Sequence, residues 1–178
     1  IMEGDYYFDL HEIGGYTMAL DYYLKADAYN SENPALNYKI GVCYIYTSEK
    51  KKAISYLEKA YQLDSEVSFD IKYVLGRAYQ VSCKYEEAID LYQGLKLTDY
   101  EMIIKKQKMD ASLYDPDARI KECENGIRLS EHPVRVFIDN MGPNINSKFS
   151  DYGPVISTDE SMMIFTSRRE GSTGGNLE

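Results

Sequence analysis

The sequence has 178 residues, and 44% of them are hydrophobic. It carries 29 acidic and 20 basic side chains, for a net charge of −9 and a pI of about 4.8. This length suits one domain or one and a part, and the acidic balance makes nucleic acids and anionic membranes poor partners. The three cysteines, Cys43, Cys83 and Cys123, are far apart, so neither a disulfide framework nor a zinc site is predicted. We expect Cys43 and Cys83 to be buried as small apolar side chains.

The chain opens with a predicted pair of helices. Residues 3 to 13 predict the first helix, with Tyr7, Leu10 and Ile13 on one face. Gly14-Gly15 predicts the bend, and residues 16 to 29 predict the second helix. An Asn at position 30 and a Pro at position 34 predict the end of this pair.

The stretch from Asn37 to Asp64 predicts a second helix pair with its bend at Thr47-Ser48. Gly41 stands on the first helix and Ala53 on the second, where two antiparallel helices would cross. Only small residues let helices approach closely at such a crossing. Larger neighbours then fill the space beside it, and these are Tyr44, on the first helix, and Leu57, on the second.

This pattern of small and large residues recurs along the chain. The alanines of the second helices, Ala19, Ala53 and Ala88, are 34 and 35 residues apart, and Gly76 corresponds to Gly41. The first pair has Tyr7 at the glycine position, which predicts looser packing there. The pattern resembles the tetratricopeptide repeat, a helix pair of about 34 residues.

That resemblance implies a mainly α fold, a right-handed superhelix of three helix pairs with a cap. The repeats are expected at about residues 1–34, 35–67 and 68–97, and capping helices at 98–132. Asp99 to Ala111 is helical in composition, and Asp115-Pro116-Asp117 is a helix start. The helix of residues 117–130 should end at His132-Pro133 and cover the open end of the stack. Its apolar face is expected to contain Ile120, Cys123, Ile127 and Leu129.

The pattern changes to period two after this helix. Val134 to Asp139 alternates and predicts a strand. The runs from Pro154 to Ser157 and from Met162 to Ser167 predict a hairpin around the turn of residues 158–161. The hairpin resembles the PD40 (WD40-like) propeller repeat, with Glu160 in place of the usual turn glycine. The matching residues are Asp151, Pro154, Ser157, Asp159, Phe165, Thr166, Ser167 and Arg168. A propeller needs several blades of four strands, so residues 133–178 would be an incomplete first blade.

Helical repeats followed by such a hairpin resemble the N-terminal part of Bacteroidetes cell-envelope proteins of the OmpA family. One branch contains the PorE-like component of the type IX secretion system. The resemblance implies a non-enzymatic protein–protein interaction scaffold on the periplasmic side of the outer membrane. There it would link an envelope or secretion complex to the membrane and peptidoglycan. It also implies an N-terminal lipid anchor that has been removed, and a C-terminal domain, absent here, that binds peptidoglycan.

The same resemblance places a protein or peptide partner in a concave groove lined by the first helix of each pair. The groove residues it implies are Phe8, Glu12, Tyr38, Val42, Tyr46, Tyr73, Arg77 and Gln80. Packing between neighbouring repeats is the alternative role for each. We expect Tyr38 and Arg77 to be dispensable for the fold but needed for partner capture.

No motif of an enzyme, phosphate loop or metal site occurs in the sequence, so no catalytic residue, cofactor or metal is predicted. The alternative is an adaptor domain of an envelope enzyme that acts on glycan or peptide. A hydrolase domain after the propeller would favour that alternative, and an OmpA-type domain would favour the scaffold.

Overall fold

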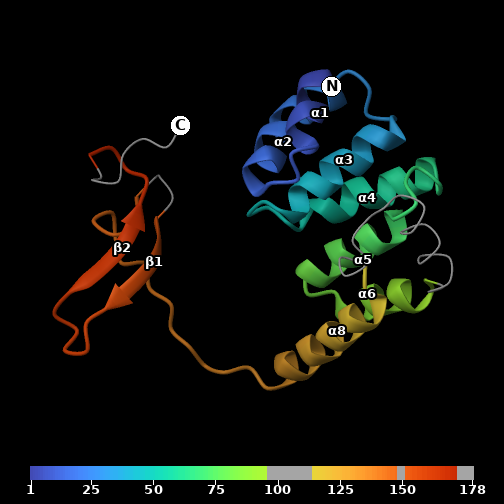
Figure 1. Cartoon of the computed structure of the whole chain (residues 1–178). Coiled ribbons are helices and arrows are strands. Elements are labelled where there is room, and N and C mark those ends of the chain that lie inside the picture. The colour runs from blue at the N-terminus through green and yellow to red at the C-terminus, as the bar shows by residue number, and fades with distance from the viewer. Residues whose placement is uncertain (96–113, 148–150, 172–178) are drawn as a thin grey trace. The chain divides into compact units, whose positions relative to one another are not determined.

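The computed structural model describes residues 1–95, 114–147 and 151–171 (Figure 1). The chain divides into two compact units, Ile1–Pro133 and Val134–Glu178. The described helices are α1 (Met2–Phe8), α2 (Ile13–Asp27), α3 (Pro34–Ile45), α4 (Lys52–Leu63), α5 (Ile71–Val81), α6 (Tyr85–Gln93) and α8 (Pro116–Glu131). Two strands follow, β1 (Asp151–Ile156) and β2 (Met163–Ser167). The protein is therefore mainly α with a small antiparallel sheet, as the sequence predicts.

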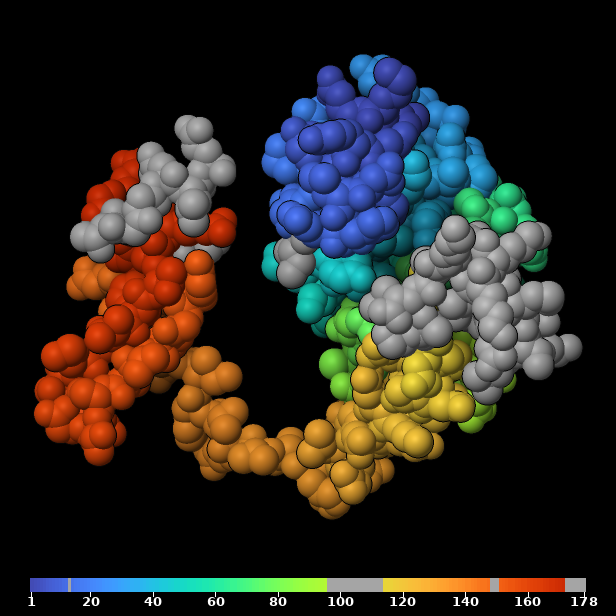
Figure 2. Space-filling model, in the orientation of Figure 1, coloured from blue at the N-terminus to red at the C-terminus, as the bar shows by residue number. Residues whose placement is uncertain are grey.

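The helices of the first unit pack in chain order. The pairs α1–α2, α3–α4 and α5–α6 each lie side by side, and α2 contacts α3 while α5 contacts both α3 and α4 (Figure 1). Helix α8 packs against α6. The space-filling view follows the same order, from the blue atoms of α1 and α2 through teal and green to the yellow atoms of α8 (Figure 2).

Four helix contacts share one geometry, in which a glycine of one helix faces a large side chain of the other. A Cβ added at any of these glycines would lie under 3.0 Å from the facing side chain. The pairs are Gly4 and Tyr23, Gly41 and Leu57, Gly76 and Tyr92, and Gly126 and Tyr85. The prediction that Tyr7 takes the glycine position of the first pair is therefore wrong, because Gly4 occupies it. The glycine and the large residue that faces it are 19 positions apart in the first pair but 16 apart in the second and third, so a constant repeat length misplaced the glycine.

The bend of the first helix pair also differs from the prediction. Helix α1 ends at Phe8 and α2 begins at Ile13, so the bend lies at residues 9–12 rather than at Gly14-Gly15. His11 has a φ of 52° there, a left-handed conformation that turns the chain. Leu10, predicted on the apolar face of the first helix, is 46% exposed.

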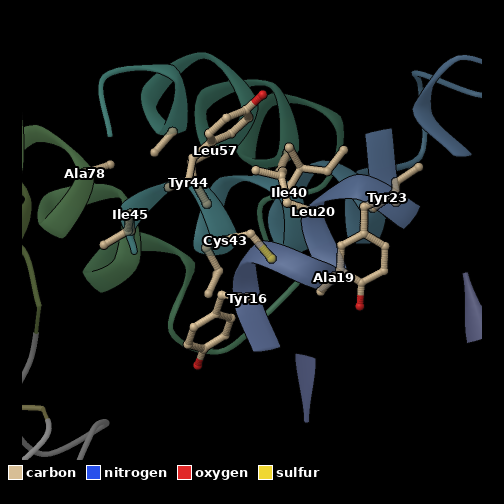
Figure 3. Packing of buried hydrophobic residues seen from close by; sticks show 14 of the residues in the cluster. Tyr16, Ala19, Leu20, Tyr23, Ile40, Cys43, Tyr44, Ile45, Leu57 and Ala78 are labelled. Carbon is tan, nitrogen blue, oxygen red and sulfur yellow. The ribbon is translucent and has the colours of Figure 1, made fainter. Parts of the chain in front are cut away.

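Side chains from α2, α3, α4 and α5 meet in the main core of the unit (Figure 3). Its central alanines, Ala19, Ala53 and Ala78, have no exposed surface. Cys43 is also fully buried, and burial raises the pKa of its thiol to about 12. Cys83 is exposed, contrary to the prediction, because it lies in the α5–α6 turn with a φ of 60°.

Helix α8 begins as predicted and ends close to the predicted residue. The Asp115 side chain accepts a hydrogen bond from the Ala118 amide, and Pro116 takes the first helical position. Cys123 is buried against α6, whereas Leu129 is 68% exposed and does not belong to the apolar face. Residues 99–111, predicted to be helical, lie outside the described residues.

The second unit contains the predicted hairpin. Strands β1 and β2 pair antiparallel, with Val155 opposite Ile164 and an irregularity between Tyr152 and Val155. The turn is held by Asp159, whose carboxylate accepts hydrogen bonds from the Ser157 and Ser161 side chains. Glu160, which replaces the usual turn glycine, has a φ of 58° and thus adopts the conformation that glycine favours.

Residues 134–139 form no strand in the described structure, so that prediction is wrong. Val134, Val136 and Ile138 alternate as a strand would, but they are 81%, 65% and 90% exposed. A strand requires a hydrogen-bonded neighbour, and none of the described residues pairs with this segment. The alternation of residues 134–139 therefore favours a strand, but no described strand pairs with this segment.

We predict that Gly41→Leu and Ala53→Leu each lower the free energy of unfolding by about 1–3 kcal/mol or more, because the added atoms overpack the α3–α4 crossing. Urea unfolding measures this. Gly14→Ala is the matched control, because nothing lies within 4 Å of a Cβ added there. Wild-type stability in both leucine variants would contradict the close approach of α3 and α4.

We also predict that the hairpin depends on the contact between Arg169 and Asp151. The Arg169 guanidinium donates to Asp151 and to the backbone carbonyls of Asn144 and Ile145. Two strands alone are marginally stable, so Arg169→Gln should reduce the population of paired β1–β2, read from NMR backbone shifts. Arg168→Gln, at an exposed neighbour, is the control. Equal strand populations in both variants would rule out this role.

The hairpin should also weaken in acid. Hydrogen bonds from Ser167, Ser147 and Arg169 lower the pKa of Asp151. A carboxylate with a lowered pKa contributes stability above its unfolded pKa, about 3.9, and loses it as the pH falls further. The strand population should therefore be constant from pH 7 to about pH 5 and then decline. Asp151→Asn should remove this contribution to the pH dependence, and a decline of the same size in that variant would contradict the assignment.

Candidate functional site

A pocket lies between α3 and α5 in the helical unit. Its volume is about 130 Å³. The lining residues are Val42, Ile45 and Tyr46 at the end of α3, Tyr73, Val74 and Arg77 on α5, and Tyr114. The structure thus brings together four residues of the predicted groove, namely Val42, Tyr46, Tyr73 and Arg77.

Arg77 is the one charged side chain among the described residues that line the pocket. It is partly buried, and it makes no hydrogen bond or ion pair with any described residue, although its charge helps to lower the pKa of Glu122. Arg119, the other nearby guanidinium, is engaged instead. It donates to both carboxylate oxygens of Glu122 at 2.9 and 2.7 Å and to the Tyr73 hydroxyl at 3.2 Å. The Arg77 guanidinium is therefore a donor group left available at the pocket.

Tyrosine rings form two walls of the pocket. Tyr46 stacks on Tyr16 of α2, with ring centroids 4.5 Å apart and an angle of 10° between the planes. Tyr73 packs on Tyr114 at 5.1 Å and on Tyr92 of α6 at 5.6 Å. Tyr46 remains 43% exposed, whereas Tyr73 is buried. The walls are thus held from behind by other rings, and Tyr46 offers surface to a ligand.

A buried carboxylate fixes the wall formed by Tyr114. Asp70, which precedes α5, is buried, and it accepts hydrogen bonds from Ser68, from Tyr114 at 3.2 Å and from Tyr38 at 2.8 Å. Burial and the Asp70 charge raise the pKa of Tyr38. Tyr38 was predicted to face the groove and to be dispensable for the fold. Instead it joins α3 to the start of α5, because its hydroxyl finds a buried acceptor.

Gln80, another predicted groove residue, belongs to a polar network between helices. Its amide donates to Glu122 of α8 at 2.7 Å, and its carbonyl accepts from Tyr92 at 3.2 Å. Burial raises the pKa of Glu122, but hydrogen bonds from Gln80 and Arg119 outweigh it and lower that pKa overall. Gln80 therefore attaches α8 to α5, and it does not line the pocket.

The remaining two predicted residues lie at the first helix pair. Phe8 packs edge-on against Tyr16 at 5.5 Å and against Tyr23 at 6.1 Å, so it belongs to the core. Glu12 is exposed and occupies the N-cap position of α2. Neither residue lines the pocket, and the predicted groove is thus reduced to its part on α3 and α5.

Three lining residues were missing from the prediction: Ile45, Val74 and Tyr114. Ile45 and Val74 belong to the same helices as the predicted residues, and a wider helix face would have included them. Tyr114 follows residues that break the 34-residue period, and no spacing rule connects it to α5. Its contact with Asp70 joins residues 44 positions apart, which only the folded chain brings together.

The described lining of the pocket supplies aromatic rings, aliphatic side chains and one guanidinium. In the described part of the chain, no group of three or more His, Cys, Asp and Glu side chains is placed to hold a metal ion. Among the helices described, none is long and apolar enough to cross a membrane. An aromatic surface beside a guanidinium can hold an apolar group and an anionic or carbonyl oxygen.

We predict that Asp70→Asn destabilises the protein by about 1–3 kcal/mol, because the amide nitrogen cannot accept a hydrogen bond and leaves a buried hydroxyl unsatisfied. Thermal or urea unfolding measures the loss. Tyr38→Phe should cost less, since it removes one donor and keeps the ring. Asp115→Asn is the control, because Asp115 is exposed and asparagine also caps helices. Wild-type stability of Asp70→Asn would contradict the proposed role of the carboxylate.

The sequence was compared with protein-family models and with curated proteins. No family model matches it, and no curated protein is significantly similar to it. The function is therefore inferred from the pocket and the contacts described above.

Proposed function

We propose that the protein is a non-enzymatic interaction scaffold whose helical unit captures a segment of a partner protein in the pocket between α3 and α5. One observation carries this proposal. Arg77 is partly buried beside Tyr46 and Tyr73 without a hydrogen-bond partner among the described residues. Arginine and tyrosine, together with tryptophan, are enriched at the energetic centres of protein interfaces.

The packing around the pocket also supports capture of a partner segment there. Helices that approach at glycines and alanines form a rigid support, and the rings of Tyr16 and Tyr92 hold Tyr46 and Tyr73 in place. A ligand then binds to a preorganised surface, and little entropy is lost in ordering it. The glycine pattern and the intervals of 34 and 35 residues support a tetratricopeptide-type superhelix as the framework.

The envelope role is the wider part of the proposal. The hairpin of residues 151–167 has the proline strand, the acidic turn and the aromatic-Thr-Ser strand of a PD40 propeller repeat. Paired helices followed by a hairpin of this sequence support membership of the OmpA-family envelope proteins and a periplasmic location at the outer membrane. The protein would there connect an envelope complex, such as a type IX secretion complex, to a peptidoglycan-binding domain.

We predict that Arg77→Gln and Tyr46→Ala weaken capture of the envelope partner by about 1–2 kcal/mol each, as interface hot spots do. Capture from an envelope extract and melting temperature are measured on the same preparations. Lys72→Gln is the matched control, because Lys72 is an exposed cation on the same helix and does not line the pocket. Full capture by both pocket variants would show that the partner binds elsewhere.

A further inference from the structure

We infer that the pocket between α3 and α5 binds one phenyl-sized apolar group that is joined to a carboxylate. In a partner protein this corresponds to a single aromatic side chain with an acidic residue beside it. The inference rests on the proposed function and specifies its ligand. Volume, wall chemistry and charge each contribute to it.

The volume limits the apolar part of the ligand. The pocket holds about 130 Å³, and an apolar cavity of about 150 Å³ accommodates benzene. One ring therefore fills the pocket, and a longer peptide would have to pass over its mouth. The pocket consequently selects a single anchoring side chain.

The wall chemistry favours a flat apolar group. Val42, Ile45 and Val74 provide aliphatic contacts, while the rings of Tyr46 and Tyr73 provide faces and edges. Aromatic rings gain about 0.5–1.5 kcal/mol from such ring contacts beyond the burial of their area. Tyr46 already stacks on Tyr16, so it presents its other face without a loss of order.

The charge specifies the second part of the ligand. Arg77 is the single charged group of the described lining, and its hydrogen-bond donors have no described partner. Glu122, on which the charge of Arg77 also acts, already binds Arg119 and Gln80, and Asp70 already accepts three hydroxyl groups. A guanidinium binds a carboxylate through two parallel hydrogen bonds. An acidic group of the ligand therefore completes the pocket.

Three small probes separate these contributions on the whole protein: 3-phenylpropionate, 3-phenylpropan-1-ol and acetate. Binding is followed by NMR through the methyl groups of Val42, Ile45 and Val74. We expect 3-phenylpropionate to shift these methyls with a millimolar Kd, the affinity usual for a ligand of this size. The alcohol should bind at least fivefold more weakly, and acetate should leave the methyls unshifted.

The variants of the capture experiment show whether Arg77 is responsible. In Arg77→Gln, the acid and the alcohol should bind equally, while the affinity for the alcohol stays as in the wild type. Lys72→Gln should keep the preference for the acid. Equal affinities for acid and alcohol in the wild type would overturn the inference. So would a preference that survives in Arg77→Gln, or methyl shifts with acetate alone.

The two proposals can fail separately. If Arg77→Gln and Tyr46→Ala abolish partner capture but the wild type does not prefer the acid, the scaffold function stands and the ligand assignment is wrong. If the acid binds as expected but both variants keep full capture, the pocket binds this chemistry without holding the partner. The wild-type comparison of acid and alcohol needs no variant, so a folding defect cannot obscure it.

Discussion

The close approach of paired helices at a glycine is the constraint on which this structure depends. At Gly41 and Gly76 the facing Leu57 and Tyr92 occupy the space where a Cβ would stand. Each glycine sets the distance between two helices, and the large residue opposite it sets their register along the axis. Fully buried alanines such as Ala53 keep the second helices equally close. The fold follows from these contacts more than from helix propensity, since helices of this length are marginal in isolation.

The pocket is a consequence of the same constraint. Val42 and Arg77 directly follow the two crossing glycines, Gly41 and Gly76, in the sequence. One residue corresponds to a rotation of about 100° around a helix, so both side chains point away from the partner helix. Both line the pocket between α3 and α5. The helix crossings that build the fold therefore also place equivalent positions of α3 and α5 at the same pocket.

The sequence predicts most of the fold because its signals are local. The spacing of Ala19, Ala53 and Ala88 places the helix pairs, and Pro116 and the turn at Asp159 locate α8 and the hairpin. Errors arose where contacts between distant residues decide, as for Gly4, which faces a residue 19 positions away instead of 16, and for Val134, which needs a neighbouring strand. In the candidate site, the sequence predicted which helix faces meet at the pocket. It did not predict which residues form hydrogen bonds with the side chains on those faces. Tyr38 has the spacing of a groove residue, and only the buried Asp70 carboxylate makes it part of the framework.

The smaller core at the end of the helical unit has a consequence for motion. Tyr73, Ala88, Tyr92 and Cys123 form a cluster much smaller than the core around α3. Such a region opens locally at a lower free energy than the rest of a protein. Opening it would release α8 and also the rings of Tyr73 and Tyr114, which form one wall of the pocket. A ligand bound there stabilises the closed state, so occupancy of the pocket and slow amide exchange in α8 should be thermodynamically linked.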